Sequence, residues 1–112
     1  MTALEDLYQS LKSLGLPVAY GEFDNTEEYP APEPPFIVYL FAYNSDVMAD
    51  NHNYAEIGNY QIELYTEKKD PARERLVQDL LKSLHMPYSK TETRLREERM
   101  YQVVYEIQLI GG

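Results

Sequence analysis

Residues 58–84 contain a strand pattern that passes directly into a helix pattern, and no other stretch constrains the fold as strongly. Between residues 59 and 66, apolar and polar side chains alternate with the period of two that a half-buried strand requires. After a short charged turn, Asp70 stands where an N-cap accepts backbone N–H bonds, and Pro71 has a φ suited to the first helical position. The sequence therefore predicts a strand, a turn and then a helix.

The helix predicted after Asp70 is amphipathic. Its apolar residues recur at spacings of three and four, so they share one side of a helix while charged and amide residues take the other. We expect the apolar side to pack on the sheet. That side contains Ala72, Leu76, Val77, Leu80, Leu81 and Leu84, and the polar side contains Arg73, Glu74, Arg75, Gln78, Asp79 and Lys82.

Length and composition limit the class of protein. A chain of 112 residues is most simply one domain, residues 1–112, and is long enough to bury a modest core without disulfides or metal. It has no cysteine, which excludes disulfides and thiol catalysis. No apolar run approaches the roughly 20 residues that span a bilayer, so we expect a soluble, unprocessed chain with no membrane partner.

The charge balance is strongly acidic. With 19 acidic against 10 basic residues the formal net charge is −9, which disfavours tight binding to a nucleic-acid backbone. Eleven tyrosines and no tryptophan are the unusual feature of the composition. Tyrosine is enriched at protein interfaces, but it is also a strand former, and the composition leaves both roles open.

The first third of the chain is predicted to hold a helix, a weak strand and a stiff loop. Thr2 and Glu5 fit a capping box, and leucines at helical spacing follow until a glycine, which predicts a helix over residues 3–14. Residues 16–23 are typical of a short edge strand. Residues 24–35 are acidic and rich in proline, so they predict a surface loop that either docks a partner or only routes the chain.

The rest of the chain predicts further strands and one long polar connection. Residues 36–43 are apolar on both faces, as in a central strand, and residues 44–55 form a connection longer than a hairpin needs. Residues 88–95 predict a polar, exposed strand. A charged turn at 96–99 then leads into a long alternating strand over 101–110.

The predicted order is helix, strand, strand, strand, helix, strand, strand. This order indicates an α+β domain with a mostly antiparallel sheet of four to five strands and two helices packed on one face. The other face would be more apolar than water normally meets, so it would need a partner. Some of the following residues are expected on it: Ile37, Tyr39, Phe41, Tyr43, Tyr65, Val104 and Ile110.

The sequence carries no recognisable catalytic constellation. His52 with Asp46 and Asp50 is a candidate metal loop, but the spacing matches no established ligand pattern, and a hydrated polar loop explains it equally well. His85 follows a predicted helix, where histidine commonly caps carbonyls. We therefore expect no enzyme activity, no catalytic residues, no metal site and no cofactor.

Three stretches carry a resemblance to a known family. They are Leu14-Gly15-Leu16-Pro17-Val18-Ala19-Tyr20, Glu33-Pro34-Pro35-Phe36-Ile37-Val38-Tyr39 and Tyr60-Gln61-Ile62-Glu63-Leu64-Tyr65-Thr66-Glu67-Lys68-Lys69-Asp70. Together they resemble the tail terminator or tail-to-head joining (tail completion) proteins of long-tailed phages and prophages. The resemblance covers nearly the whole chain, and it is structural rather than catalytic.

The resemblance implies an α+β subunit that assembles as a ring, possibly a hexamer, on the end of the tail tube. Its partners would be other copies of the chain, the tail tube protein and the head connector proteins, with DNA passing through the channel without specific binding. It would reside in the virion, at the tail end, or in the bacterial cytoplasm during assembly. The charge of −9 agrees with this, because an acidic channel repels phosphate.

The expected ring contacts fall into two groups. Tyr39, Phe41, Tyr65 and Val104 are expected to meet a neighbouring subunit or tail protein, so serine at Tyr39 and Phe41 should weaken assembly more than folding. The polar loop at 44–54 is expected to be mobile until assembly orders it. Its anchors would be Val47, Met48 and Tyr54, whereas Tyr43 is an interface candidate on the apolar sheet face.

An alternative function is an acidic protein-binding module, such as a DNA-mimicking inhibitor of a host enzyme. Such a protein needs carboxylates spaced along one continuous face. Here the acidic residues are spread over the loop at 24–33, both predicted helices and residues 92–98, a distribution more typical of ordinary solubility.

Overall fold

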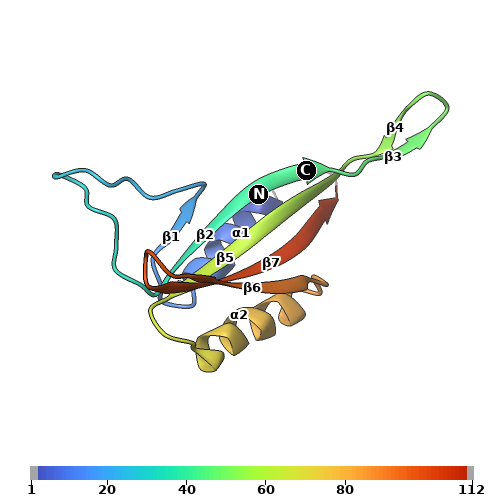
Figure 1. The fold of residues 1–112 in the computed structure, drawn as a ribbon. Coiled ribbons are helices and arrows are strands. Elements are labelled where there is room, and N and C mark those ends of the chain that lie inside the picture. Colours follow the sequence, from blue (N-terminus) through green and yellow to red (C-terminus); the bar gives the residue numbers. More distant parts are fainter. Residues whose placement is uncertain (1–2, 111–112) are drawn as a thin grey trace.

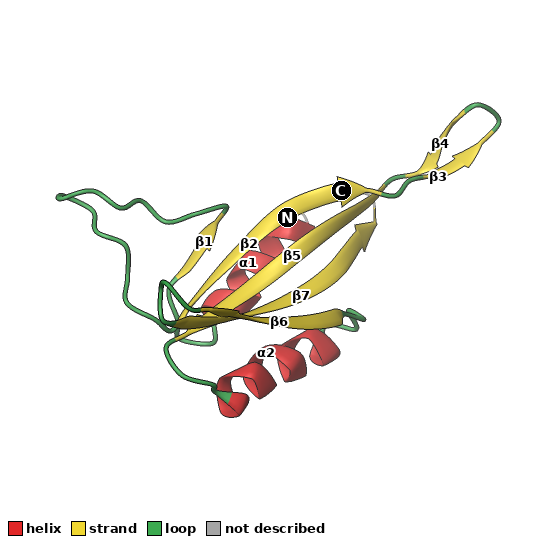
Figure 2. Cartoon of the chain, viewed as in Figure 1, coloured by secondary structure: helices red, strands yellow, loops and turns green. Residues whose placement is uncertain are grey.

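The computed structural model describes residues 3–110, apart from the side chain of Tyr54. A five-stranded sheet has the strand order β1-β2-β5-β7-β6, and β3 and β4 form a separate hairpin (Figure 1 and Figure 2). β1 runs parallel to β2, and every other pair of neighbours in the sheet is antiparallel. The elements are α1 (Ala3–Lys12), β1 (Val18–Tyr20), β2 (Phe36–Asn44), β3 (Val47–Ala49), β4 (His52–Ala55), β5 (Ile57–Thr66), α2 (Pro71–Ser83), β6 (Ser89–Leu95) and β7 (Met100–Ile110).

The α+β class, the two helices and the mostly antiparallel sheet are confirmed. The predicted order lacks β3 and β4, which lie inside the connection at 44–55. The first helix ends two residues early, because the N–H groups of Leu14 and Gly15 each bond three residues back and tighten the last turn. The predicted capping box depends on Thr2, which lies outside the described residues.

Both helices cover one face of the sheet. The strand register places Ile37 of β2 opposite Leu64 of β5, and Leu64 opposite Val103 of β7, so these residues share a face. Side chains from both helices pack onto that face and complete a single core cluster. The rest of the buried cluster is Leu7 and Leu11 of α1, Val77 and Leu81 of α2, and Tyr39, Tyr60, Ile62, Tyr105, Ile107 and Leu109 of the sheet.

Ile37 and Tyr39 therefore lie in the core, and the predicted place of Tyr39 on the opposite face is wrong. Tyr39 is 7% exposed, and its ring centroid lies 5.9 Å from that of Tyr8 on α1. Phe41 lies on the same side and packs edge-to-face on Tyr60 at 5.5 Å, although it remains 42% exposed. Because β2 is apolar at almost every position, its sequence does not show which alternate residues face the helices, and the pairing with β5 decides it.

The face opposite the helices is more polar than predicted, since β5 and β7 alternate apolar residues inward with polar residues outward. Towards β1 it is covered by the following loop, where Phe23 packs edge-on against Phe36 at 5.3 Å and Val38 is buried. Tyr65 and Val104 do lie on this face, half-buried among polar neighbours. These neighbours are Gln61, Glu63, Gln102 and Glu106.

The helix α2 begins where the sequence predicts, with the Asp70 carboxylate accepting a hydrogen bond from the Arg73 backbone N–H at 3.1 Å. Its buried side differs from the prediction. Glu74 is buried beside Val77, whereas Leu76 is 48% exposed. The Glu74 carboxylate can be buried because two lysines pair with it. The buried side of α2 therefore includes Glu74 and differs from the apolar stripe that the leucine spacing predicts.

Candidate interaction surfaces

The hairpin arm, defined as residues 45–56, projects beyond the sheet in line with β2 and β5 (Figure 1). Its two strands are joined at Asp50 and Asn51, whose φ values of 52° and 65° are those of a two-residue hairpin turn. With the arm, the molecule measures 50 Å along its longest axis against 31 and 28 Å along the others. The connection predicted as an irregular loop is therefore a hairpin, and the Asp50-Asn51 pair is the sequence signal for it.

Hydrogen bonds clamp the root of the hairpin arm. The Asp46 carboxylate accepts from the Ile57 N–H at 2.9 Å and from the Asn53 side chain at 2.5 Å. Asn59, 1% exposed, donates to the Tyr43 carbonyl at 3.1 Å and to Ser45 Oγ at 2.9 Å. Its Oδ1 accepts from the side chain of Gln108 on β7 at 3.1 Å. The direction of the arm is thus tied to the sheet by Asp46, which the sequence indicated only as a candidate metal ligand, and by Asn59, which it did not indicate.

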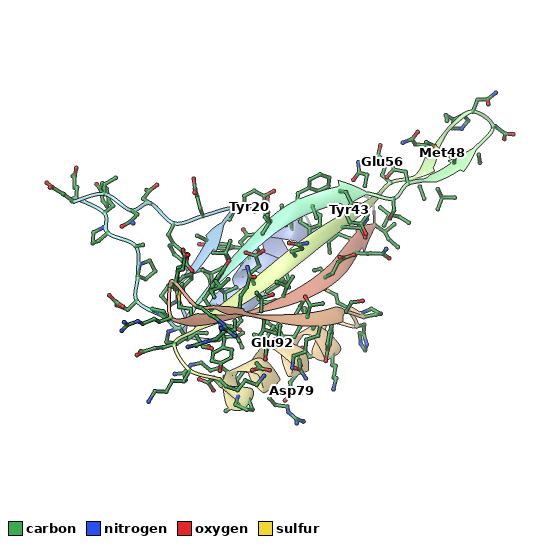
Figure 3. All side chains as sticks on the ribbon, in the orientation of Figure 1. Tyr20, Tyr43, Met48, Glu56, Asp79 and Glu92 are labelled. Atoms are coloured by element: carbon green, nitrogen blue, oxygen red, sulfur yellow. The ribbon has the colours of Figure 1, made fainter. Side chains whose placement is uncertain are left out.

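The hairpin arm and its base expose large apolar groups. Val47 is 47% exposed and Met48 69%, both on β3. At the base, Ile110 is 74% exposed and Tyr43 51%, and the Tyr43 hydroxyl donates to the Glu106 carboxylate at 3.0 Å. That hydrogen bond raises the pKa of Tyr43 above its usual value. Met48 and Tyr43 are labelled in Figure 3, one on the arm and the other where the arm leaves the sheet.

The eight predicted interface residues do not form one surface. Tyr39 is in the core and Phe41 lies on the helix side. Tyr65 lies on the opposite face with Val104, and its hydroxyl donates to Glu63 and accepts from Gln102, both at 2.8 Å. Burial, with a smaller contribution from Glu63, raises the pKa of Tyr65 to about 12. The remaining four belong to the arm or its base, namely Tyr43, Val47, Met48 and Tyr54, whose side chain lies outside the described part.

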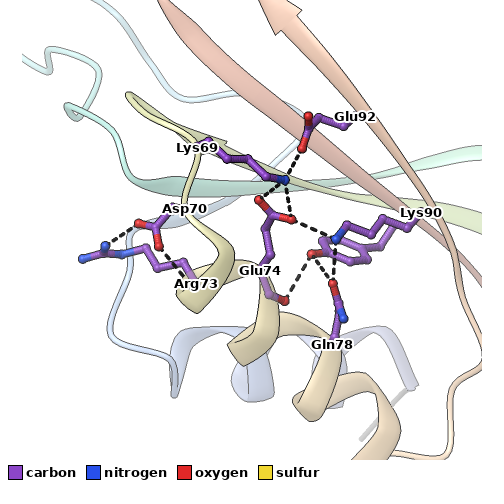
Figure 4. Close-up of polar contacts among 8 residues, drawn as sticks. Lys69, Asp70, Arg73, Glu74, Gln78, Lys90 and Glu92 are labelled. Atoms are coloured by element: carbon purple, nitrogen blue, oxygen red, sulfur yellow. Dashed lines mark hydrogen bonds and ion pairs between the residues drawn. The ribbon is translucent and has the colours of Figure 1, made fainter.

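A buried carboxylate links α2 to β6 and to the turn before α2 (Figure 4). Glu74 is 4% exposed, and its carboxylate lies 2.7 Å from Lys69 Nζ and 2.8 Å from Lys90 Nζ. Lys69 also pairs with Glu92. Burial acts to raise the pKa of Glu74, but the hydrogen bonds from the two lysines outweigh it, so this pKa lies below its usual value.

This cluster supports the fold instead of forming an open site. The Tyr105 hydroxyl donates to the Glu74 backbone carbonyl at 3.2 Å, and burial raises the pKa of Tyr105 far above its usual value. Glu74 lines none of the main hollows on the described surface. Both of its oxygens are already occupied by ammonium groups, so the carboxylate is placed to hold α2 on the sheet.

A basic pocket of about 500 Å³ lies at the end of the sheet remote from the hairpin arm. Arg94 stacks over the Tyr101 ring, with its guanidinium carbon 4.7 Å from the ring centroid. The pocket holds five of the ten basic residues of this acidic chain. It is lined by Glu67, Lys68, Lys69, Arg94, Arg96, Arg99 and Tyr101. The pocket is not predicted by the sequence pattern, because two separate turns contribute the bases, although Arg94, Arg96 and Arg99 lie close together along the chain.

The acidic loop, defined as residues 21–35, connects β1 to β2 and extends away from the sheet (Figure 1). It contains five carboxylates and no basic residue. Its apex is a closed turn, since the Thr26 N–H donates to the Tyr29 carbonyl at 3.1 Å and the Tyr29 N–H donates to Thr26 Oγ1 at 2.9 Å. Glu27 and Glu28 occupy the two central positions of this turn, and both are exposed.

Among residues 3–110, no group of three or more histidine, aspartate and glutamate side chains is arranged to hold a metal ion. The Asp46 carboxylate, considered above as a metal ligand, instead receives hydrogen bonds at the arm root. No helix in the same part of the chain is long and apolar enough to cross a membrane. Comparison with protein-family models and with curated protein sequences finds no match to this chain.

Proposed function

We propose that this protein is a structural subunit of a phage or prophage tail, which caps the tail tube and joins the tail to the head, acting as a ring and without catalytic chemistry. The observation that supports this most is the hairpin arm. It combines a root fixed by Asp46 and Asn59 with exposed apolar side chains on β3. A fixed direction and an exposed apolar surface are what a docking element needs.

The arm extends beyond its own sheet, so the core of its own subunit does not cover Val47 and Met48 (Figure 1). Apolar groups in this position are stabilised when a second protein removes them from water, at about 25 cal/mol per Å² of apolar surface. The ring, the tail tube protein and the head connector are the proposed partners of this surface. The resemblance of the sequence to the tail completion family is the reason for choosing these partners.

The charge of the chain favours a protein that surrounds DNA without binding it over one that binds DNA tightly. The net charge of −9 opposes close approach of a phosphate backbone at low and moderate salt. A DNA-mimicking inhibitor is less well supported, because the basic pocket lies at the same end of the molecule as the base of the acidic loop and interrupts any continuous acidic face.

The proposal is tested by replacing Val47 and Met48 together with serine in the phage or prophage that carries this gene. We expect a normally folded subunit and a loss of completed, head-joined tails, counted by electron microscopy and by infectious titre. Leu76→Ser is the control, because Leu76 is as exposed as Val47 but lies on α2. Wild-type tail completion by the double variant, or equal loss in the control, would contradict the proposed role of the arm.

A further inference from the structure

The acidic loop and the basic pocket are two complementary surfaces at one end of the same molecule. Phe36, which follows the loop, pairs with Tyr65 of β5, and the pocket begins two residues after Tyr65. Part of the acidic loop also lies beside Arg99, since Asn25, Glu33 and Arg99 line one adjoining hollow of about 510 Å³. The hairpin arm leaves from the other end of β2 and β5.

We infer that Glu27 and Glu28 at the apex of the acidic loop bind the basic pocket of a neighbouring copy of this chain, chiefly through Arg96 and Arg99. The contact rests on the proposed function, because it names one way in which copies join in the ring. Arginine binds carboxylate through two parallel hydrogen bonds, which gives direction as well as attraction.

The apex is already shaped for such a contact. The two hydrogen bonds between Thr26 and Tyr29 close the turn, and the Ala31 N–H donates to the Asn25 side chain at 3.3 Å just behind it. Four prolines in residues 30–35 further restrict the backbone. Little conformational freedom is therefore lost when the apex binds. Tyr29, 63% exposed, lies beside the two glutamates and is able to stack on an arginine of the pocket.

A neighbouring copy suits the apex better than the pocket of its own chain does. The apex extends outward in Figure 1, and no ion pair within residues 3–110 joins the loop to the pocket. The basic side of the contact is available, since the ion pairs of the pocket residues involve Lys69 alone. The pocket lining holds five bases against one carboxylate, Glu67, and the loop holds five carboxylates and no base, so the two surfaces are opposite in charge.

The two surfaces differ from each other, so the contact is heterologous. Such a contact forms a ring when the rotation between neighbouring copies closes and a filament when it does not, and the ring of the proposed function requires the first case.

Crosslinking tests the inference directly, because the natural chain has no cysteine. Tyr29→Cys and Lys68→Cys are made in separate chains, mixed at low ionic strength and treated with a short thiol crosslinker. We expect the mixture to give crosslinked dimers, and each variant alone to give far fewer. High salt should remove the product, since charge attraction is screened.

Charge reversal then identifies the residues. In the crosslinking mixture, Glu27→Lys with Glu28→Lys in the loop donor, or Arg96→Glu with Arg99→Glu in the pocket donor, should each lower the yield by about tenfold or more. Both reversals together should restore it. Arg75→Glu with Lys82→Glu, on the exposed side of α2, is the matched control and should leave the yield unchanged. Thermal unfolding checks that each variant is folded.

Equal yields in mixed and single-variant samples, or yields that ignore the reversals, would overturn the inference. A labelled DNA duplex is measured in the same buffer. If it binds through Arg96 and Arg99 while the cysteine variants do not crosslink, the pocket takes nucleic acid and the inference is wrong. Tail completion is measured separately with the Val47 and Met48 variant. Crosslinking in the mixture together with normal tail completion by that variant would support the contact and contradict the phage role. Loss of tail completion without crosslinking would support the phage role and contradict the contact.

Discussion

The Nζ of Lys90 on β6 lies 2.8 Å from Oε1 of Glu74 on α2, and this pair joins the most exposed strand of the sheet to the helix that covers it. Glu74 is buried, whereas Lys69 and Lys90 remain partly exposed. The carboxylate has therefore lost its water and depends on the two lysines, while each lysine still contacts solvent. Removing the carboxylate and removing a lysine should have different consequences.

We predict that Glu74→Ala lowers the free energy of unfolding by about 1–3 kcal/mol, because it removes the partner of both lysines and leaves a small cavity under α2. Glu92→Ala is the control. Glu92 also pairs with Lys69, but it is 39% exposed, so its loss should cost about 1 kcal/mol or less. Urea unfolding of both variants measures the difference, and equal effects would contradict the structural role of Glu74.

The ion pairs of Glu74 also predict how folding stability depends on pH. The pKa of Glu74 in the folded protein is held below its usual 4.5, mainly by Lys69 and Lys90 acting against burial, and Arg73 lowers the pKa of Asp70 below 3.8. A lowered pKa contributes stability above the unfolded value, and that contribution is lost as the pH falls through the folded pKa. We expect stability to decline below about pH 4.5. Glu74→Gln should show a shallower decline from pH 5 to pH 3 in unfolding midpoints, and parallel curves would show that another group is responsible.

Tyr39 and Phe41 should respond differently to truncation. Tyr39 is buried and its ring packs against those of Tyr8 and Tyr20, so Tyr39→Ser should cost about 3 kcal/mol or more of folding stability. Phe41 is 42% exposed, so Phe41→Ser should cost about 1–2 kcal/mol. This replaces the expectation from sequence that both act mainly in assembly. Denaturant unfolding of the two single variants decides it, and a folded, fully stable Tyr39→Ser protein would restore the original expectation.

Asn59 lies on β5, outside the hairpin arm, but its hydrogen bonds should limit the opening of the arm. Asn59→Ala removes two donors and one acceptor at the arm root, and we expect a loss of about 1–3 kcal/mol together with faster amide exchange in residues 47–55. Asn53→Ala, which removes one exposed hydrogen bond to Asp46, should change exchange less. If the arm exchanges at the same rate in both variants and in the natural chain, the root does not fix its direction.

Local patterns in the sequence determined most of the elements. Asp70 and Pro71 marked the start of α2, and two-residue alternation marked β5 and β7, because capping and strand alternation depend on neighbours along the chain. The α+β class followed from the order of these elements. The exposed polar strand β6 was equally readable, since lysine, glutamate and threonine are rarely buried together.

Tertiary structure alone decided which residues meet. The pairing of β2 with β5 assigned Tyr39 to the core, because a strand that is apolar on both sides has no preferred face until a partner fixes its register. Glu74 is buried because Lys69 and Lys90 reach it from other elements, and such pairing cannot be read from helical spacing. The basic pocket likewise exists because two distant turns lie side by side. Helix caps and strand alternation depend on residues that are neighbours along the chain. Which face of a strand is buried, which ion pairs form and where pockets lie depend on contacts between residues far apart in the chain.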